Sequence, residues 1–232
     1  MKVLGIIPAR GGSKGIPNKN RKMLQGKPLM QYTIESALAS KKLCKVIFSS
    51  EDEQLNALAQ KLGVEVPFIR PERYSRDNSP SIDLVKHALQ TLSKENECYD
   101  AVCLLQVTSP FREAQFIDQA ISKYEKAETD SLISVIEVPQ EYNPHWVFET
   151  NDSGHLIPAV GDKEIIKRRQ DLPTAFIRDG AIYITKTEVV LKQNTLFGDS
   201  ISYIQSNLET YVNIDTIEDW KKAEKIANAL FC

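Results

Sequence analysis

After Met1-Lys2 the chain reads Val3-Leu4-Gly5-Ile6-Ile7-Pro8-Ala9-Arg10-Gly11-Gly12-Ser13-Lys14-Gly15. The first five of these residues form a short apolar run, which is typical of a β-strand buried on both faces of a sheet. The run that follows is polar and rich in glycine, which indicates a loop. In open α/β sheets, ligands bind beyond the carboxyl ends of the strands. This stretch therefore predicts an α/β sheet with its site at the first loop.

The loop is suited to binding phosphate groups. Its three glycines let the backbone approach an anion and direct N–H groups toward it, while Arg10 and Lys14 add positive charge. Lys19 and Asn20 follow on the same loop. Two basic residues among three glycines are unusual for a turn that only reverses the chain.

Two well-known phosphate motifs do not match the sequence. The dinucleotide motif G-x-G-x-x-G would require glycine at positions 11, 13 and 16, but residues 13 and 16 are Ser and Ile. A P-loop would require G-x-x-x-x-G-K-[ST], and the sequence contains no such run. The first loop therefore fits a nucleoside triphosphate better than a dinucleotide.

Beyond this loop, short apolar runs alternate with amphipathic helical stretches. Further strands are expected at 45–49, 64–69, 101–106 and 132–138, and helices at 28–40, at about 55–62 with Gly63 as the stop, at 81–93 and at 113–127. The first 138 residues thus read as repeated β-α units. Such units predict an α/β fold with a doubly wound, mainly parallel sheet and right-handed crossovers.

The alternation breaks over residues 139–175, which contain four prolines and the basic stretch Lys167-Arg168-Arg169. We interpret this segment as an excursion from the sheet within a single domain that covers residues 1–232. Regular structure is expected to resume with a strand at 181–184, a short helix near 187–193 and a strand near 201–204. An amphipathic helix from Ile217 to Leu230 closes the chain.

Composition narrows the class of protein. Lys plus Arg number 29 against 31 Asp plus Glu, and this net charge of −2 gives no bulk attraction to nucleic acid or to a membrane. No apolar run reaches the ~18 residues of a membrane span, and a buried-type strand directly after Met1 disfavours a signal peptide. The cysteines, none in C-x-x-C spacing, argue against a zinc site or a disulfide framework and favour a cytoplasmic location. They are Cys44, Cys98, Cys103 and Cys232.

Five ordered segments of the sequence resemble the CMP-sialic acid synthetases, which are the acylneuraminate cytidylyltransferases and their relatives acting on other nonulosonic acids. They span nearly the whole chain, and their shared order makes the match more specific than any single motif. The segments are Ile7-Pro8-Ala9-Arg10-Gly11-Gly12-Ser13-Lys14-Gly15-Ile16-Pro17 with Lys19-Asn20, Arg70-Pro71 with Asp77 and Ser81, Leu104-Leu105-Gln106-Val107-Thr108-Ser109-Pro110-Phe111-Arg112, Arg168-Arg169-Gln170-Asp171-Leu172-Pro173 followed by Asp179-Gly180-Ala181-Ile182-Tyr183, and Ile214-Asp215-Thr216.

The resemblance implies a Rossmann-like fold of the nucleotide-diphospho-sugar transferase type. It implies a reaction in which CTP and a nine-carbon 2-keto sugar acid give a CMP-sugar and pyrophosphate, with Mg²⁺ or another divalent cation. It also implies a homodimer in which the 139–175 excursion crosses to the neighbouring subunit and serves dimerisation and substrate binding. Nucleotidyl transfer depends mainly on positioning and charge neutralisation, which agrees with a basic first loop.

The same resemblance assigns roles to individual residues. As catalytic groups, Arg10, Lys14 and Lys19 would hold the triphosphate and stabilise the departing pyrophosphate. Asp215 would ligate the metal, with Asn213 beside it. The nucleotide-binding residues would be Ala9, Arg10, Gly11, Gly12, Asn20, Arg70 and Ser81, with Arg70 helping to select the cytosine. The sugar-binding residues would be Gln106, Thr108, Ser109 and Arg169, of which Arg169 is suited to a carboxylate.

Two features depart from the family pattern. Many sialate synthetases carry an acidic D-x-D pair near the metal, but the first position here is Asn213, which offers a carbonyl oxygen without a charge. Many also carry a lysine soon after a proline in the excursion, whereas Pro144 is followed here by His145-Trp146. The second departure points to a non-standard sugar, with Trp146 either packing on an N-acyl group or filling a core.

Plainer interpretations stay open beside these. Asp215 followed by Thr216 also fits a helix N-cap, and His87 and Tyr183 fit structural positions. A synthetase for the eight-carbon acid Kdo is one alternative function, although its loop typically lacks the G-G-S-K-G run. A catalytically silent CTP-binding protein is a second alternative. A glycosyltransferase on a similar sheet is a third, but the sequence shows no acceptor-binding domain for it.

Overall fold

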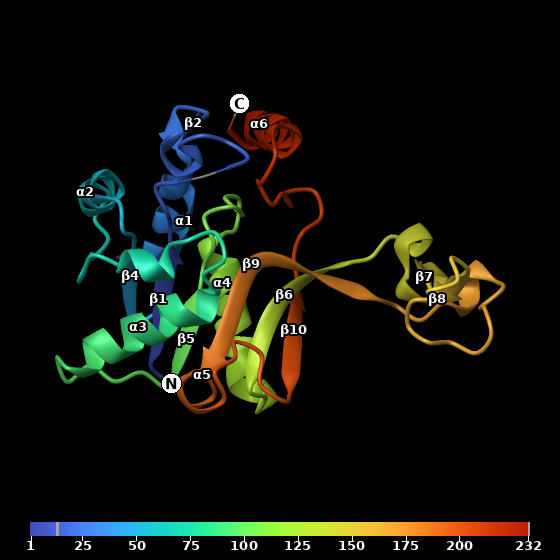
Figure 1. Ribbon diagram of the computed structural model, residues 1–232. Helices are drawn as coiled ribbons and strands as arrows, with labels where there is room; N and C mark the ends of the chain where they lie inside the picture. The colour runs from blue at the N-terminus through green and yellow to red at the C-terminus, as the bar shows by residue number, and fades with distance from the viewer. Residues whose placement is uncertain (13, 232) are drawn as a thin grey trace.

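The computed structural model describes residues 1–12 and 14–231, so Ser13 of the first loop and Cys232 lie outside the described residues. A six-stranded sheet in the order β10-β6-β9-β5-β1-β4 forms the centre of the molecule (Figure 1). Its strands are β1 (Val3–Pro8), β4 (Lys45–Ser49), β5 (Ala101–Leu104), β6 (Ser131–Glu137), β9 (Phe176–Lys186) and β10 (Ile201–Gln205).

The sheet is mainly parallel, as the sequence predicts. β1 pairs in parallel with β4 and β5, and β10 pairs in parallel with β6. Only β9 among the described strands of this sheet runs antiparallel to both of its neighbours, β5 and β6. The periodicity of β9 predicts a buried strand, but not its direction.

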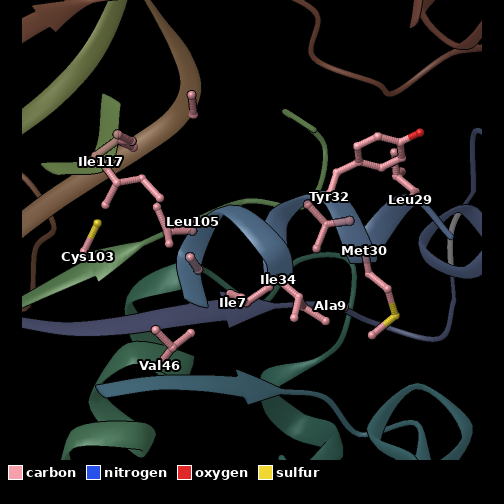
Figure 2. Packing of buried hydrophobic residues seen from close by; sticks show 14 of the residues in the cluster. Ile7, Ala9, Leu29, Met30, Tyr32, Ile34, Val46, Cys103, Leu105 and Ile117 are labelled. Carbon is pink, nitrogen blue, oxygen red and sulfur yellow. The ribbon is translucent and has the colours of Figure 1, made fainter. Parts of the chain in front are cut away.

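Helices cover both faces of the sheet. They are α1 (Leu29–Leu38), α2 (Glu53–Lys61), α3 (Ser81–Ser93), α4 (Ala114–Ala127), α5 (Thr187–Gln193) and α6 (Ile217–Phe231). Buried residues of α1, α2, α4 and α6 share one apolar cluster, and those of α3 and α5 share another. Successive residues of β1 supply the two clusters in turn, as the alternation of a strand requires. Figure 2 shows part of the first cluster, in which Met30 and Ile34 of α1 share the packing with Ile7 and Ala9.

One predicted strand is wrong. The sequence predicts a strand at 64–69, but this segment makes a single parallel bridge, between Ile47 and Glu65. Pro67 lies two residues after Glu65, and because proline has no N–H to donate, it cannot continue the ladder. The segment then turns toward the carboxyl end of β4, where the Arg70 N–H donates to the Ser50 carbonyl at 2.9 Å.

Residues 139–175 leave the sheet between β6 and β9 and extend away from it as an arm (Figure 1). The arm carries a two-stranded hairpin of β7 (Phe148–Thr150) and β8 (Leu156–Pro158). Its two ends lie side by side, because the Val138 N–H donates to the Ala175 carbonyl at 2.9 Å. The rest of the regular structure includes a small ribbon near the first loop, β2 (Met23–Leu24) and β3 (Lys27–Pro28).

Every helix in the described part of the chain is too short or too polar to cross a membrane.

Candidate active site

A cleft of about 530 Å³ opens beyond the carboxyl ends of β1 and β5. The glycine-rich loop after β1, the segment 70–84 and the residues after β5 form its walls, and residues 213–215 close it. The predicted site residues that line it are Ala9, Arg10, Lys14, Lys19, Asn20, Arg70, Ser81, Gln106, Thr108, Asn213 and Asp215. Residues from four distant parts of the sequence therefore meet at the place that the first loop predicts.

The cleft carries an excess of positive charge. Among the described residues that line it, five side chains are cationic and two are anionic; they are Arg10, Lys14, Lys19, Arg70 and Arg76 against Asp77 and Asp215. A concave surface with this balance attracts a polyanion and strengthens its contacts with the cations. The arrangement suits the triphosphate of a nucleotide.

Asp77 holds the two cations of the first loop together. Its carboxylate lies 2.5 Å from Arg10 Nη1 and 2.6 Å from Lys14 Nζ. The Lys14 ammonium and the Arg10 guanidinium lower the pKa of the Asp77 carboxyl below its ordinary value. Asp77 thus pairs with the positive groups that a phosphate would contact.

Arg70 is buried beneath the cleft and joins three parts of its wall. Its Nη2 donates to the Ala9 carbonyl at 2.7 Å and to Glu51 Oε2 at 2.8 Å, and its Nε donates to Ser75 Oγ at 2.8 Å. Burial lowers the pKa of Arg70, against the raising effect of Glu51. Because Arg70 bonds to the Ala9 carbonyl, it orients the loop around Ala9. It also lines the cleft.

Two further contacts fix the first loop. Asn20 Nδ2 donates to the Arg10 carbonyl at 2.8 Å, and the Gly11 N–H donates to Glu51 Oε1 at 2.8 Å. A Cβ on Gly15 would lie 2.1 Å from the Asp215 carbonyl oxygen, so glycine is required where the loop passes residues 213–215. The glycine of position 15 therefore serves a close approach between two parts of the protein.

Lys19 and Asp215 meet at the far side of the cleft. Lys19 Nζ donates to the Ile214 carbonyl at 2.5 Å and to Asp215 Oδ1 at 2.9 Å. Thr216 makes the cap of α6, since its Oγ1 accepts from the Asp219 N–H at 3.2 Å, and Asp219 Oδ2 accepts in return from the N–H groups of Asp215 and Thr216. The Asp215 carboxylate is thus not used as the helix cap and points its charge at Lys19.

The oxygen atoms beside Asp215 are few. Asn213 Nδ2 donates to Asp215 Oδ2 at 3.1 Å, and the buried Asn213 Oδ1 has no hydrogen-bond partner in the described structure. Within residues 1–12 and 14–231, no group of three or more His, Cys, Asp or Glu side chains is placed to hold a metal ion. The donor set is therefore one carboxylate and one unpartnered amide oxygen.

A second cavity, of about 620 Å³, adjoins the cleft. The two share Ser81, Gln106 and Asn213 in their linings. Sequence reasoning did not select Arg178 and Phe197, which also line the second cavity, and it gave Tyr183 a structural place only. Tyr183 is indeed mostly buried and packs edge-on against Phe197, yet it borders this cavity.

Gly180 sits where the two cavities meet. It has a φ of +82°, and a Cβ at this position would lie 3.0 Å from Gln106 Oε1. Glycine therefore allows β9 to pass close to the Gln106 amide in a backbone conformation that other residues rarely adopt. The quoted motif Asp179-Gly180-Ala181-Ile182-Tyr183 could have pointed to this wall of the site.

The structure does not bring four of the predicted residues to the linings of these two cavities. Gly11 and Gly12 lie on the first loop outside the lining, and Ser109 is buried behind it. Arg169 lies on the arm, where it is mostly exposed and 3.5 Å from Glu141. Within one chain, Arg169 is therefore apart from the cleft.

Trp146 and His87, which the sequence also brings to notice, contact other parts of the protein and do not line the cleft. Trp146 lies on the arm and donates from Nε1 to the Ile166 carbonyl at 2.7 Å. His87 packs against the rings of Phe68 and Tyr74, and burial lowers its pKa. The predicted structural place of His87 agrees with these contacts.

Comparisons with known proteins agree on one family. Residues 4–231 match the model of a family described as "Cytidylyltransferase". A pseudaminic acid cytidylyltransferase of Campylobacter jejuni is 35% identical over 97% of this chain and 95% of its own length. An N-acylneuraminate cytidylyltransferase of Escherichia coli is 34% identical over 96% of this chain and 51% of its own length. A CMP-N,N'-diacetyllegionaminic acid synthase of Legionella pneumophila is 31% identical over 97% of this chain and 96% of its own length.

Two solved structures share the fold at low sequence identity. A CMP:2-keto-3-deoxy-manno-octonic acid synthetase complexed with CTP is similar with a TM-score of 0.74, over the whole of both chains, at 14% identity. A 4-diphosphocytidyl-2C-methyl-D-erythritol synthase of Anaerococcus prevotii is similar with a TM-score of 0.68, over 98% of both chains, at 11% identity.

Proposed function

The chain belongs to the cytidylyltransferase family and is a nucleotidyltransferase, and from this premise we propose that it joins CTP to a nonulosonic acid. The observation that carries the proposal is the pair of contiguous cavities. A cationic cleft adjoins a second cavity of about 620 Å³, and the two share Ser81, Gln106 and Asn213. A volume of this size is ample for a nine-carbon sugar, since small-molecule sites commonly measure ~300–1,000 Å³.

The proposed reaction takes place at the border between the cavities. The oxygen of the sugar's anomeric hydroxyl forms a bond to the α-phosphorus of CTP, the bond from that phosphorus to the bridging oxygen breaks, and pyrophosphate leaves. The hydroxyl proton is released to solvent. Arg10, Lys14 and Lys19 neutralise the triphosphate and the charge that grows on the leaving pyrophosphate, which is where such catalysis obtains most of its effect.

A divalent cation fits this site as an ion to which the protein supplies only a few ligands. Asp215 and Asn213 would supply a carboxylate and an amide oxygen, and the buried Asn213 Oδ1 without a partner agrees with that use. Mg²⁺ is commonly bound by one or two carboxylates together with substrate phosphates and water. When bound, it would neutralise phosphate charge, whereas Lys19 holds the Asp215 carboxylate in place beside it.

The arm supports the proposal of a homodimer. It exposes several large apolar side chains at the far end from the sheet; they include Val147, Leu156, Ile157, Val160 and Ile165. Exposed apolar side chains gathered on one segment are typical of contact surfaces between proteins. In such a dimer the arm of one subunit, with Arg169, would reach toward the second cavity of the other.

The test is pyrophosphate release in the presence of CTP and Mg²⁺. The panel contains pseudaminic, N-acetylneuraminic and N,N'-diacetyllegionaminic acids, together with the eight-carbon 2-keto-3-deoxy-manno-octonic acid. We expect release with a nine-carbon acid.

The variant Arg10→Ala should lower kcat/KM by about 100-fold or more, because it removes one charged donor from the transition state. The matched control is Lys27→Ala, whose side chain pairs with Glu35 away from the cleft.

Other outcomes would replace the proposal. Release with the eight-carbon acid alone would make the protein a synthetase for that acid. Binding of CTP without release under any acid of the panel would indicate a silent CTP-binding protein. Activity of Arg10→Ala equal to that of the wild type would remove the triphosphate from the first loop.

A further inference from the structure

The second cavity has a simple charge pattern. Among the described residues that line it, Arg178 is the one cation and Asp179 the one anion. The Asp179 carboxylate is almost fully buried and accepts hydrogen bonds from the Ala181 N–H, at 2.9 Å, and from the hydroxyls of Ser134 and Ser206. Its charge is therefore engaged between β6, β9 and the end of β10, and the cavity presents the Arg178 charge to a ligand.

Arg178 also differs from four of the five cations of the cleft, all but Arg76, because those four pair with carboxylates. Arg10 and Lys14 pair with Asp77, and Lys19 pairs with Asp215. In the described part of the chain, Arg178 has no ion pair with a carboxylate. Its guanidinium carbon instead lies 6.0 Å from the centre of the Phe197 ring. An aromatic face holds a guanidinium in place without neutralising it, which leaves its N–H groups for a ligand.

The strand places this cation next to the reaction border. Arg178 and Gly180 both belong to β9, and both line the second cavity. Gly180 is the residue whose position lies against the Gln106 amide, where the two cavities meet. The Arg178 guanidinium is thus anchored on the same wall of the cavity as that border.

We propose that Arg178 binds the carboxylate of the acceptor sugar acid and so selects an acid over a neutral sugar, an inference that rests on the proposed function. The carboxylate is the group of an N-acylated nonulosonic acid that is ionised at neutral pH. A planar guanidinium accommodates it with two parallel hydrogen bonds, which gives both affinity and orientation. Arg169, the cation predicted for this task, pairs with Glu141 on the arm of the same chain.

The experiment separates recognition of the carboxylate from any general loss of structure. The probes are two competitive inhibitors that lack the attacking hydroxyl. One is the 2-O-methyl glycoside of the acid that the wild type turns over, and the other is the carboxamide of that glycoside. Their inhibition constants are measured for the wild type, Arg178→Ala, Arg178→Lys and the control Lys192→Ala, which removes an exposed cation of α5 paired with Glu188.

We expect the wild type and Lys192→Ala to prefer the acid to the amide by about ten- to one-hundredfold, the range typical of a charged hydrogen bond. In Arg178→Ala this preference should fall to about threefold or less, with the KM for CTP unchanged. Arg178→Lys should retain part of it, because a charge remains but the planar fork is lost.

Two results would overturn the inference. An acid preference in Arg178→Ala equal to that of the wild type would show that the carboxylate is bound elsewhere. Loss of the preference together with a tenfold rise in the KM for CTP would show a disturbed site rather than a lost contact. If the wild type releases no pyrophosphate with any acid, the proposed function fails first, and this result is distinct from both.

Discussion

At the scale of single residues, Asp77 joins the two cations of the first loop. Because its carboxylate contacts both Arg10 and Lys14, CTP must displace it before the triphosphate can use these cations. We expect Asp77→Asn to bind CTP roughly two- to fivefold more tightly, since pairs on exposed side chains are individually weak. The measurement is the Kd for CTP by calorimetry, with Glu188→Gln on α5 as the control.

Whether Asp77→Asn binds CTP more tightly or more weakly separates two roles of Asp77, competition with the nucleotide and contact with it. Its pKa lies below the ordinary value, so the carboxyl stays ionised at neutral pH. The gain in affinity should therefore be the same at about pH 6 and about pH 8. Weaker binding by Asp77→Asn would show that the carboxylate contacts the nucleotide or its cation instead of competing with it.

At the scale of elements, α6 connects the core to the site. Trp220 is nearly buried, its Nε1 donates to Glu224 Oε1 at 2.8 Å, and Lys22 lies over its ring at 4.3 Å. Trp220→Ala should lower the free energy of unfolding by about 3–5 kcal/mol, because it leaves a cavity under the helix. Denaturant unfolding monitored by circular dichroism measures this loss. The control Lys225→Ala, on the exposed face of α6, should change it by less than about 0.5 kcal/mol; an equal loss in both variants would contradict the assignment of Trp220 to the core.

At the scale of the whole molecule, the proposed dimer gives the arm a testable role. If its apolar side chains form the contact between two subunits, Leu156→Asp places an uncompensated charge in that contact and should shift the protein from dimer to monomer. Light scattering coupled to size exclusion measures the mass. Leu208→Asp is the matched control, because Leu208 is similarly exposed but lies outside the arm. A wild type that elutes at the mass of one chain would end the dimer proposal.

Much of this architecture follows from periodicity. The helix over 81–93 has the bounds of α3, and the strand near 201–204 is β10 within one residue. Apolar side chains at helical or alternating spacing report directly on burial, which explains this success. The direction of β9 depends on its pairing partners, which a local pattern does not carry. The loss of the strand at 64–69 has a local signal, since Pro67 within the run argues against a strand there.

The site residues also divide into those that a sequence motif predicts and those that only the fold brings together. Arg10, Lys19 and Asp215 belong to motifs with a recognisable order, and the cleft holds all of them. Arg178 and Phe197 belong to no phosphate-binding pattern, and they reach one cavity only because β9 and the segment after α5 fold against each other. Arg169 shows the reverse case, since its motif predicts a sugar contact but its own chain places it on the arm.

The hydrogen bond between Val138 and Ala175 has a consequence for how such proteins diverge. The two ends of the arm are already neighbours in the ladder of β6 and β9. The intervening residues can therefore be exchanged as a unit without moving the strands that carry them. Evolution can lengthen, shorten or exchange the arm while the register of the sheet and the chemistry of the first loop stay the same. The same geometry makes chimaeras practical, because a graft at residues 138 and 175 requires no redesign of the strands that receive it.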